Sequence, residues 1–171
     1  WSLILESITL SFSNSSQAQS SEDELKTNAT TLFDEEKYVE ALPLFSQILS
    51  TYPKDPTYNY KYGTCVLYGS REKDKALKYL QFAVTKSNVD VIAFYYLAKA
   101  YHHNYQFAQA IIYYNKYKSK TSTKEHQKFQ LLREIKMCQN GEQLLKSITD
   151  IGVLSKKEIK TKDFFRLYDL K

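Results

Sequence analysis

The 171-residue sequence contains few of the residues that interrupt regular secondary structure. It has 4 glycines and 3 prolines, while 43% of its residues are hydrophobic and 25% are charged. This scarcity of glycine and proline disfavours a turn-rich β fold and favours helices. The length and the hydrophobic content suffice for one domain with a packed core.

Motifs that would indicate an enzyme are also absent. The sequence has no glycine-rich phosphate loop, no serine nucleophile elbow and no HExxH metal motif. Its 3 histidines include the adjacent pair His102 and His103. Neighbouring helical residues point about 100° apart, so this pair is poorly placed to chelate one metal. We therefore expect no catalysis and no metal or other cofactor.

Only 2 cysteines are present, Cys65 and Cys138, and they are too far apart for a CxxC motif. Cys65 lies next to apolar Val66 on a predicted helix, where a small buried thiol packs well. We expect two free thiols, with a disulfide as the alternative, and the cysteines do not decide the compartment.

What the sequence does contain is a repeated pair of amphipathic helices. The clearest copy spans residues 91–118, where small residues stand between bulky aromatic and aliphatic ones. Two helix axes can approach closely where both side chains are small. Small residues occupy matching positions in three copies: Ala29 and Ala41, Gly63 and Ala76, and Ala98 and Ala110.

This pattern, with a period of about 34 residues, resembles the tetratricopeptide repeat (TPR) family over residues 22–118. The resemblance implies an all-α TPR solenoid of three helical hairpins. The second copy has one extra residue, which we place in the turn around Gly69 and Ser70. The tryptophan often found early in the repeat is absent. Pro43 falls inside a predicted second helix, where we expect a kink rather than a break.

A longer helix is predicted over residues 121–148, covering the exposed end of the third hairpin. Ser122 and Glu125 form a capping-box pattern at its start. Gly141 weakens this helix by roughly 1 kcal/mol relative to alanine. Its expected apolar face consists of Phe129, Leu132, Ile135, Cys138 or Met137, Leu144 and Leu145.

The two ends of the chain do not follow the repeat. Residues 1–20 resemble the later half of a signal peptide, with an apolar stretch and then Ser16 and Ala18 ahead of a cleavage point. The alternative is an ordinary N-terminal helix or tail. The apolar stretch is too short to span a membrane. We thus divide the chain into this segment, a TPR domain with capping helix (21–148), and a linker or docking tail (149–171).

The charges are distributed unevenly. Residues 1–57 carry 3 lysines against 9 acidic residues, whereas residues 58–171 carry 21 lysines and arginines against 10 acidic residues. The pattern indicates either a solvated surface that changes sign or acidic and basic regions that orient a partner. No nucleic-acid-binding motif accompanies the basic part, so no nucleic-acid partner is expected.

In TPR proteins the first helix of each hairpin lines a concave groove. Carried over position by position, the resemblance implies groove residues Lys26, Thr30, Tyr60, Lys61, Thr64, Tyr95, Lys99 and His102. Such a groove suits an extended peptide or an acidic chain end. The alternative is that these are ordinary polar residues and half-packed tyrosines. Thr30 and Lys61 stand where a carboxylate-clamping TPR domain has asparagine, so that clamp is not matched.

The third copy, the helix after it and the end VLSKKEIKTKDFFRLYDLK resemble a group of bacterial envelope proteins. There an N-terminal TPR domain precedes a WD-like propeller and an OmpA-like peptidoglycan-binding domain, and some members serve type IX secretion. This resemblance implies a periplasmic protein–protein interaction scaffold with further domains in the same polypeptide. The alternative is a cytoplasmic TPR adaptor that binds peptides. Either protein would bind a protein or peptide partner and no small-molecule substrate.

Overall fold

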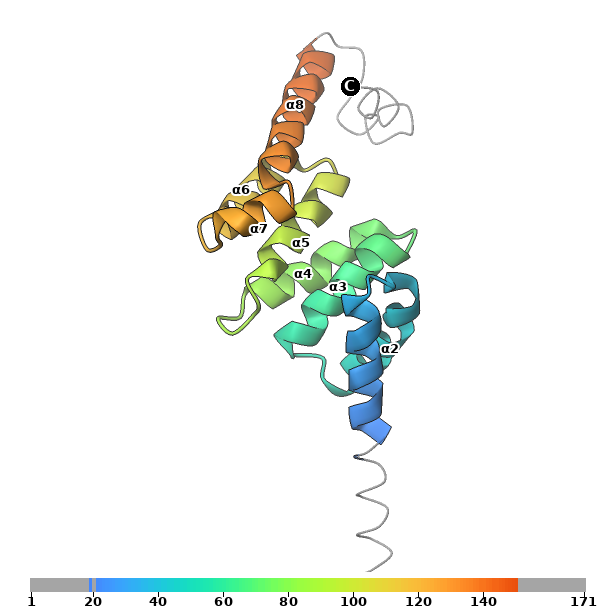
Figure 1. The fold of residues 1–171 in the computed structure, drawn as a ribbon. Coiled ribbons are helices and arrows are strands. Elements are labelled where there is room, and N and C mark those ends of the chain that lie inside the picture. The colour runs from blue at the N-terminus through green and yellow to red at the C-terminus, as the bar shows by residue number, and fades with distance from the viewer. Residues whose placement is uncertain (1–18, 20, 151–171) are drawn as a thin grey trace, which may run out of the picture.

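The computed structural model describes residue 19 and residues 21–150, which form helices joined by turns with no strand among them (Figure 1). A first helix is described over residues 21–34. It is followed by α2 (Tyr38–Thr51), α3 (Pro56–Gly69), the short 3₁₀ helix η1 (Lys73–Lys75), α4 (Ala76–Val84), α5 (Ile92–His103), α6 (Phe107–Lys118), α7 (Thr123–Lys128) and α8 (Leu131–Asp150).

Consecutive helices pack against one another, so the molecule is extended from the first helix and α2 at one end to α8 at the other (Figure 1). The predicted all-α fold is confirmed for the described residues. Packing between sequence neighbours follows from the short connections between helices, which bring each helix back along the previous one.

The connection between α2 and α3 is set by local hydrogen bonds. Asp55 caps α3 by accepting hydrogen bonds from the backbone N–H groups of Thr57 and Tyr58, at 2.8 and 3.1 Å, and Pro56 occupies the first helical turn, where a missing N–H does no harm. The buried amide of Asn59 donates to the carbonyls of Pro53 and Asp55. A polar side chain on the buried face of α3 therefore fixes the preceding turn.

The small residues of the repeat lie in the core. Gly63 is buried, and Ala29, Ala41, Ala76, Ala98 and Ala110 have no exposed surface. A Cβ atom at Gly63 would lie 2.8 Å from Cγ of Leu80 and 3.3 Å from the carbonyl oxygen of Ala76. Helices α3 and α4 thus approach more closely than any side chain at Gly63 would allow.

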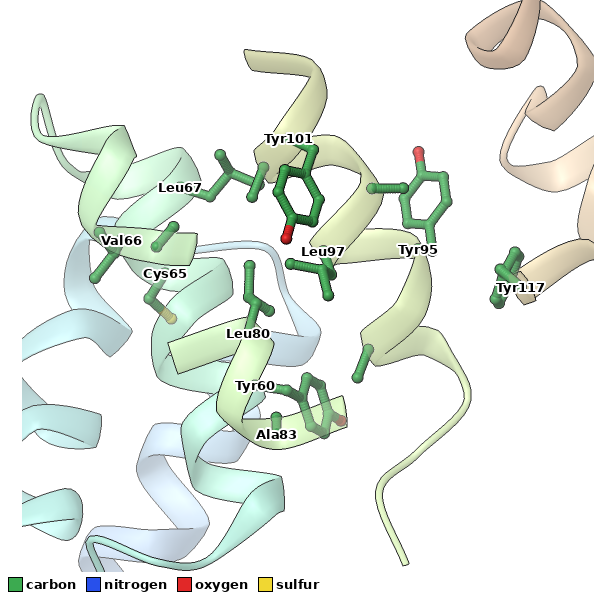
Figure 2. Packing of buried hydrophobic residues seen from close by; sticks show 14 of the residues in the cluster. Tyr60, Cys65, Val66, Leu67, Leu80, Ala83, Tyr95, Leu97, Tyr101 and Tyr117 are labelled. Atoms are coloured by element: carbon green, nitrogen blue, oxygen red, sulfur yellow. The ribbon is translucent and has the colours of Figure 1, made fainter. Parts of the chain in front are cut away.

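Apolar side chains fill the space beside these close contacts. Figure 2 shows Leu67, Leu80 and Leu97, from α3, α4 and α5, pointing toward one another. Tyr95 projects from the other side of α5, toward Tyr117 of α6. One buried cluster therefore runs through consecutive helices instead of forming a single central core.

Two expectations about local structure are confirmed: the helix is not broken at Pro43, and both cysteines are free. Helix α2 continues through Pro43 without a break, and Pro43 itself is exposed. Cys65 and Cys138 are both free and buried, and burial raises the pKa of each thiol to about 12.

The prediction of one long helix over residues 121–148 is wrong. The segment forms two helices, α7 and α8, and Gln130 between them has a φ of 47°. The capping box at Ser122 is present, with Glu125 N–H donating to Ser122 Oγ at 3.4 Å and Ser122 N–H donating to the Glu125 carboxylate at 3.1 Å. The helix therefore starts as predicted but stops after six residues.

This break changes which leucine is buried. Leu132, expected on the apolar face, is 65% exposed, while Leu131 is fully buried. A continuous helix would carry the apolar face from Phe129 through Leu132, whereas α8 restarts at Leu131 with a new register. Ile135 and Cys138 are buried as expected.

Gly141 has a packing role that its helix propensity does not reveal. A Cβ atom there would lie 2.5–2.8 Å from the ring of Phe107, at the start of α6. The ring therefore rests directly on the backbone of α8, and the glycine permits this contact.

The expectations for residues 1–18, 20 and 151–171, including the signal-peptide-like segment, lie outside the described residues. Helix α8 ends at Asp150, two residues beyond the expected Ile148. None of the described helices is long and apolar enough to cross a membrane.

Candidate interaction site

The eight predicted groove residues come from three helices that are each the first of a hairpin. Lys26 and Thr30 lie on the helix over residues 21–34, and the others lie on α3 and α5. Half of them are largely unavailable to a partner: Tyr60, Thr64, Tyr95 and His102 are buried. The other four, Lys26, Thr30, Lys61 and Lys99, are half-buried.

Lys26 is held by its own hairpin. Its ammonium donates to Glu22, which also accepts a hydrogen bond from the hydroxyl of Tyr52 on α2. The same ammonium lies 4.3 Å from the centre of the Tyr52 ring. The hydrogen bond to Glu22 raises the pKa of Lys26, and its counterpart lowers the pKa of Glu22. This lysine already has a counter-ion.

Lys99 and His102 are joined to a residue that the sequence reasoning missed. Lys99 Nζ donates to Glu134 Oε1 at 3.1 Å, and His102 Nδ1 lies 3.3 Å from Glu134 Oε2. The hydroxyl of the buried Tyr114 donates to the same carboxylate at 3.1 Å. We call these four residues the Glu134 network; it connects α5, α6 and α8.

The Glu134 network keeps its carboxylate ionised. Burial by itself would raise the pKa of Glu134, but the hydrogen bond from His102 and the positive charge of Lys99 outweigh it and lower the pKa to about 2. Burial, reinforced by the charge of Lys99, lowers the pKa of the neighbouring His103 to about 4. Lys99 and His102 thus hold α8 in place in this chain.

Lys61 has a different environment. Its ammonium lies 5.2 Å from the ring centre of Phe33 and 6.0 Å from that of Phe45. No ion pair joins it to a carboxylate of the described residues, and burial lowers its pKa. Of the three predicted groove lysines, Lys61 therefore retains a charge without a direct counter-ion among these residues.

The buried tyrosines belong to an extended set of ring contacts. Tyr60 meets the ring of Phe33 edge-on at 6.1 Å, and Tyr95 packs against Phe129 with ring centres 4.6 Å apart. Thr64 donates its hydroxyl to the carbonyl of Tyr60 at 2.8 Å. We call this connected set of rings the aromatic layer, and the ammonium of half-buried Lys61 lies over its Phe33 ring.

Other members of this layer were not among the predicted site residues. Tyr38 stacks on Tyr68 with ring centres 5.1 Å apart, and Tyr96 meets the ring of Tyr68 edge-on. Tyr96 also contacts Phe33 at 6.4 Å, which joins the first helix directly to α5. The abundance of tyrosine, 15 in the chain, was the signal for this layer.

Glu134 could have been suspected from the sequence. It lies between Leu131 and Cys138 on the buried stripe of the last helix, where an acidic side chain needs a partner. Which residues would supply that partner depends on contacts across 20–35 positions of the chain, between Tyr114 or Lys99 and Glu134.

The described residues include no group of three or more histidine, cysteine or acidic side chains that could hold a metal ion. Searches against models of known protein families and against curated proteins find no match.

Proposed function

We propose that this chain is a TPR-like solenoid that acts as a non-catalytic protein–protein interaction scaffold. The observation that carries the proposal is the set of buried small residues at matching positions of three helix pairs, spaced as in TPR hairpins. A stack of such pairs buries continuous apolar surface and leaves one face formed by the first helix of each pair.

The proposed partner is a protein segment that lies across this face. Lys26, Thr30, Lys61 and Lys99 are half-buried on the first helices of the three pairs, and Tyr60 and Tyr95 are buried on two of the same helices. Before binding, Lys26 is held by Glu22, Lys61 lies over the ring of Phe33, and Lys99 is held by Glu134. A preorganised surface lowers the conformational entropy lost on association, which favours the bound state.

Photo-crosslinking tests the proposed face. A photoreactive p-benzoylphenylalanine at Thr30 should crosslink to a partner protein in the cells that make this chain, and Lys61→Glu should reduce the yield. The same amino acid at exposed Thr85, at the end of α4, is the control. Equal crosslinking from both positions, or none from Thr30, would place the interaction elsewhere.

Substitution of Tyr95 and Lys99 to alanine is less suited to this test. Tyr95 is buried and Lys99 belongs to the Glu134 network. Loss of partner binding in that double variant would therefore report on the fold of the third hairpin as much as on recognition.

We further propose that the scaffold works in the periplasm as the first module of a larger envelope protein. The resemblance of residues 22–171 to such modules and the signal-like first segment support this. The intact mass and cell fraction of the native protein test it. A species far above 20.0 kDa that begins at Gln19 and fractionates with the envelope is expected. A cytosolic species near that mass would favour the cytoplasmic peptide-binding adaptor.

A further inference from the structure

Two exposed patches of opposite charge lie on elements at opposite ends of the molecule. The acidic patch surrounds Val39 at the start of α2 and consists of Asp34, Glu35, Glu36, Val39 and Glu40. The basic patch surrounds Leu132 at the start of α8 and consists of Lys128, Leu132, Arg133 and Lys136. Figure 1 shows α2 and α8 at the two ends of the ribbon.

Each patch centres on an unusually exposed apolar side chain. Val39 is 68% exposed and Leu132 is 65% exposed, the highest fractions among the large hydrophobic residues that the structure describes. Lys136 lies one helical turn beyond Leu132 and therefore on the same face of α8. An apolar centre with a charged rim is the usual composition of a protein interface.

Ion pairs within the molecule do not neutralise the charge of either patch. Glu134 is the one acidic residue between positions 126 and 141, and its carboxylate points inward to Lys99 and His102. At the other end Lys37 pairs with Glu35 at 2.8 Å, which leaves Glu36 and Glu40 without an ion pair among the described residues. The excess charge at each end is thus directed to the solvent.

We propose that a second copy of this chain binds head to tail, with the acidic patch of one molecule against the basic patch of the next. The complementary charges and the apolar centres occur on the same chain. One contact between two copies therefore brings the opposite charges together and covers both exposed apolar side chains. Because the two patches differ, the contact is heterologous and can repeat along a row of molecules. The proposal uses none of the eight groove residues and is independent of the proposed function.

Sedimentation velocity of the full 171-residue chain tests this association. Species larger than 20.0 kDa should grow with protein concentration at low ionic strength. They should dissociate near 1 M salt, where the Debye length is about 3 Å. A monomer at all concentrations in low salt overturns the proposal.

Charge reversal identifies the surfaces. Glu36→Lys with Glu40→Lys makes both ends basic, and Arg133→Glu with Lys136→Glu makes both ends acidic. Each double variant alone should associate more than about tenfold more weakly, because like charges then face each other. An equimolar mixture should recover the association, since each variant keeps one intact patch. A mixture that stays monomeric overturns the proposal.

One further double variant is a control for charge reversal, and two single variants test the apolar centres. Lys54→Glu with Lys86→Glu makes the same change of charge in the connections that follow α2 and α4, at exposed positions that belong to neither patch, and should leave the association unchanged. Val39→Ser and Leu132→Ser keep the charge and should each weaken association. Circular dichroism establishes that every variant is folded. Equal loss in the control, or no loss in the serine variants, contradicts the proposed surfaces.

Discussion

At the scale of single residues, Glu134 determines how the last helix is attached. Its carboxylate accepts hydrogen bonds from groups on α5 and α6 and is held ionised in a partly buried place. An ionised carboxylate in such a place is stable only while its partners remain. The docking of α8 therefore depends on a charge as well as on apolar contact.

This dependence predicts loss of stability in acid. His103 on α5 and Glu134 on α8 both have folded-state pKa values below their ordinary ones. The values are about 4 against 6.5 for His103 and about 2 against 4.5 for Glu134. The unfolded chain therefore binds these protons first, and stability present above the ordinary pKa is lost as pH falls toward the folded value. The free energy of unfolding should fall between pH 6.5 and 4 through His103, and between pH 4.5 and 2 through Glu134.

Urea denaturation across this pH range measures the effect. His103→Gln should remove the upper part of the pH dependence and Glu134→Gln the lower part. Glu142→Gln, at an exposed position on the same helix, is the control and should leave the profile unchanged. Identical profiles in all variants would mean that neither group carries the dependence.

Gly141 gives a second prediction at this scale. In an isolated helix, alanine would be more stable than glycine by roughly 1 kcal/mol. Here the added methyl group would overlap the ring of Phe107, so Gly141→Ala should destabilise the protein by about 1–3 kcal/mol. Thermal unfolding measures the change, with exposed Asn140→Ala as the neutral control. A more stable Gly141→Ala variant would contradict the contact.

At the scale of helices, the sequence predicted where three hairpins lie and failed at the break after α7. Small residues at a fixed spacing and polar turns were sufficient to locate the helix pairs, because the spacing and the turns are both local features of the sequence. No glycine or proline stands at Gln130, so the sequence does not indicate the break there. It depends on how Phe129 packs against Tyr95 and Tyr117, a contact between distant positions.

The spacing of the small residues makes a testable claim about helix packing. Ala98→Leu adds three carbon atoms at a position with no exposed surface and should cost about 1–3 kcal/mol. Ala108→Leu, at an exposed position of α6, is the matched control and should change stability by less than about 0.5 kcal/mol. An unchanged melting temperature for Ala98→Leu would refute the assigned register.

The break between α7 and α8 has its own test. Glycine adopts positive φ without steric cost, so Gln130→Gly should leave the melting temperature unchanged or raise it. Gln130→Val should destabilise by roughly 1–2 kcal/mol, because a β-branched residue is disfavoured there. If residues 121–148 formed one helix, the glycine variant would instead lose roughly 1 kcal/mol.

At the scale of the whole molecule, the position of a residue within the repeat predicted which helix it lies on. It did not predict which other residues its side chain contacts. Among the described residues Lys61 forms no ion pair, whereas Lys26 and Lys99 are paired with Glu22 and Glu134. Position within a hairpin fixes the direction of a side chain. The partner of Lys26 lies on its own helix, whereas that of Lys99 comes from α8, whose register the sequence did not reveal.

The linear arrangement also predicts a gradient of local stability. Helices α3 to α5 have neighbours on both sides, while the first helix and the last turns of α8 lie at the ends (Figure 1). Amide hydrogen exchange should be slowest in α3, α4 and α5 and fastest toward residues 21–26 and 144–150. Uniform protection over all helices would instead indicate one cooperative unit.

The aromatic layer has a consequence for spectroscopy. Rings of Tyr38, Tyr68, Tyr96 and Tyr95 follow one another with centres 5.1–6.3 Å apart. Excitation passes readily between tyrosines at such separations, so light emitted by the folded chain loses the polarisation of the light it absorbed. Separating the hairpins interrupts this transfer. The fluorescence anisotropy of the natural tyrosines therefore reports how the hairpins are stacked, without any attached label.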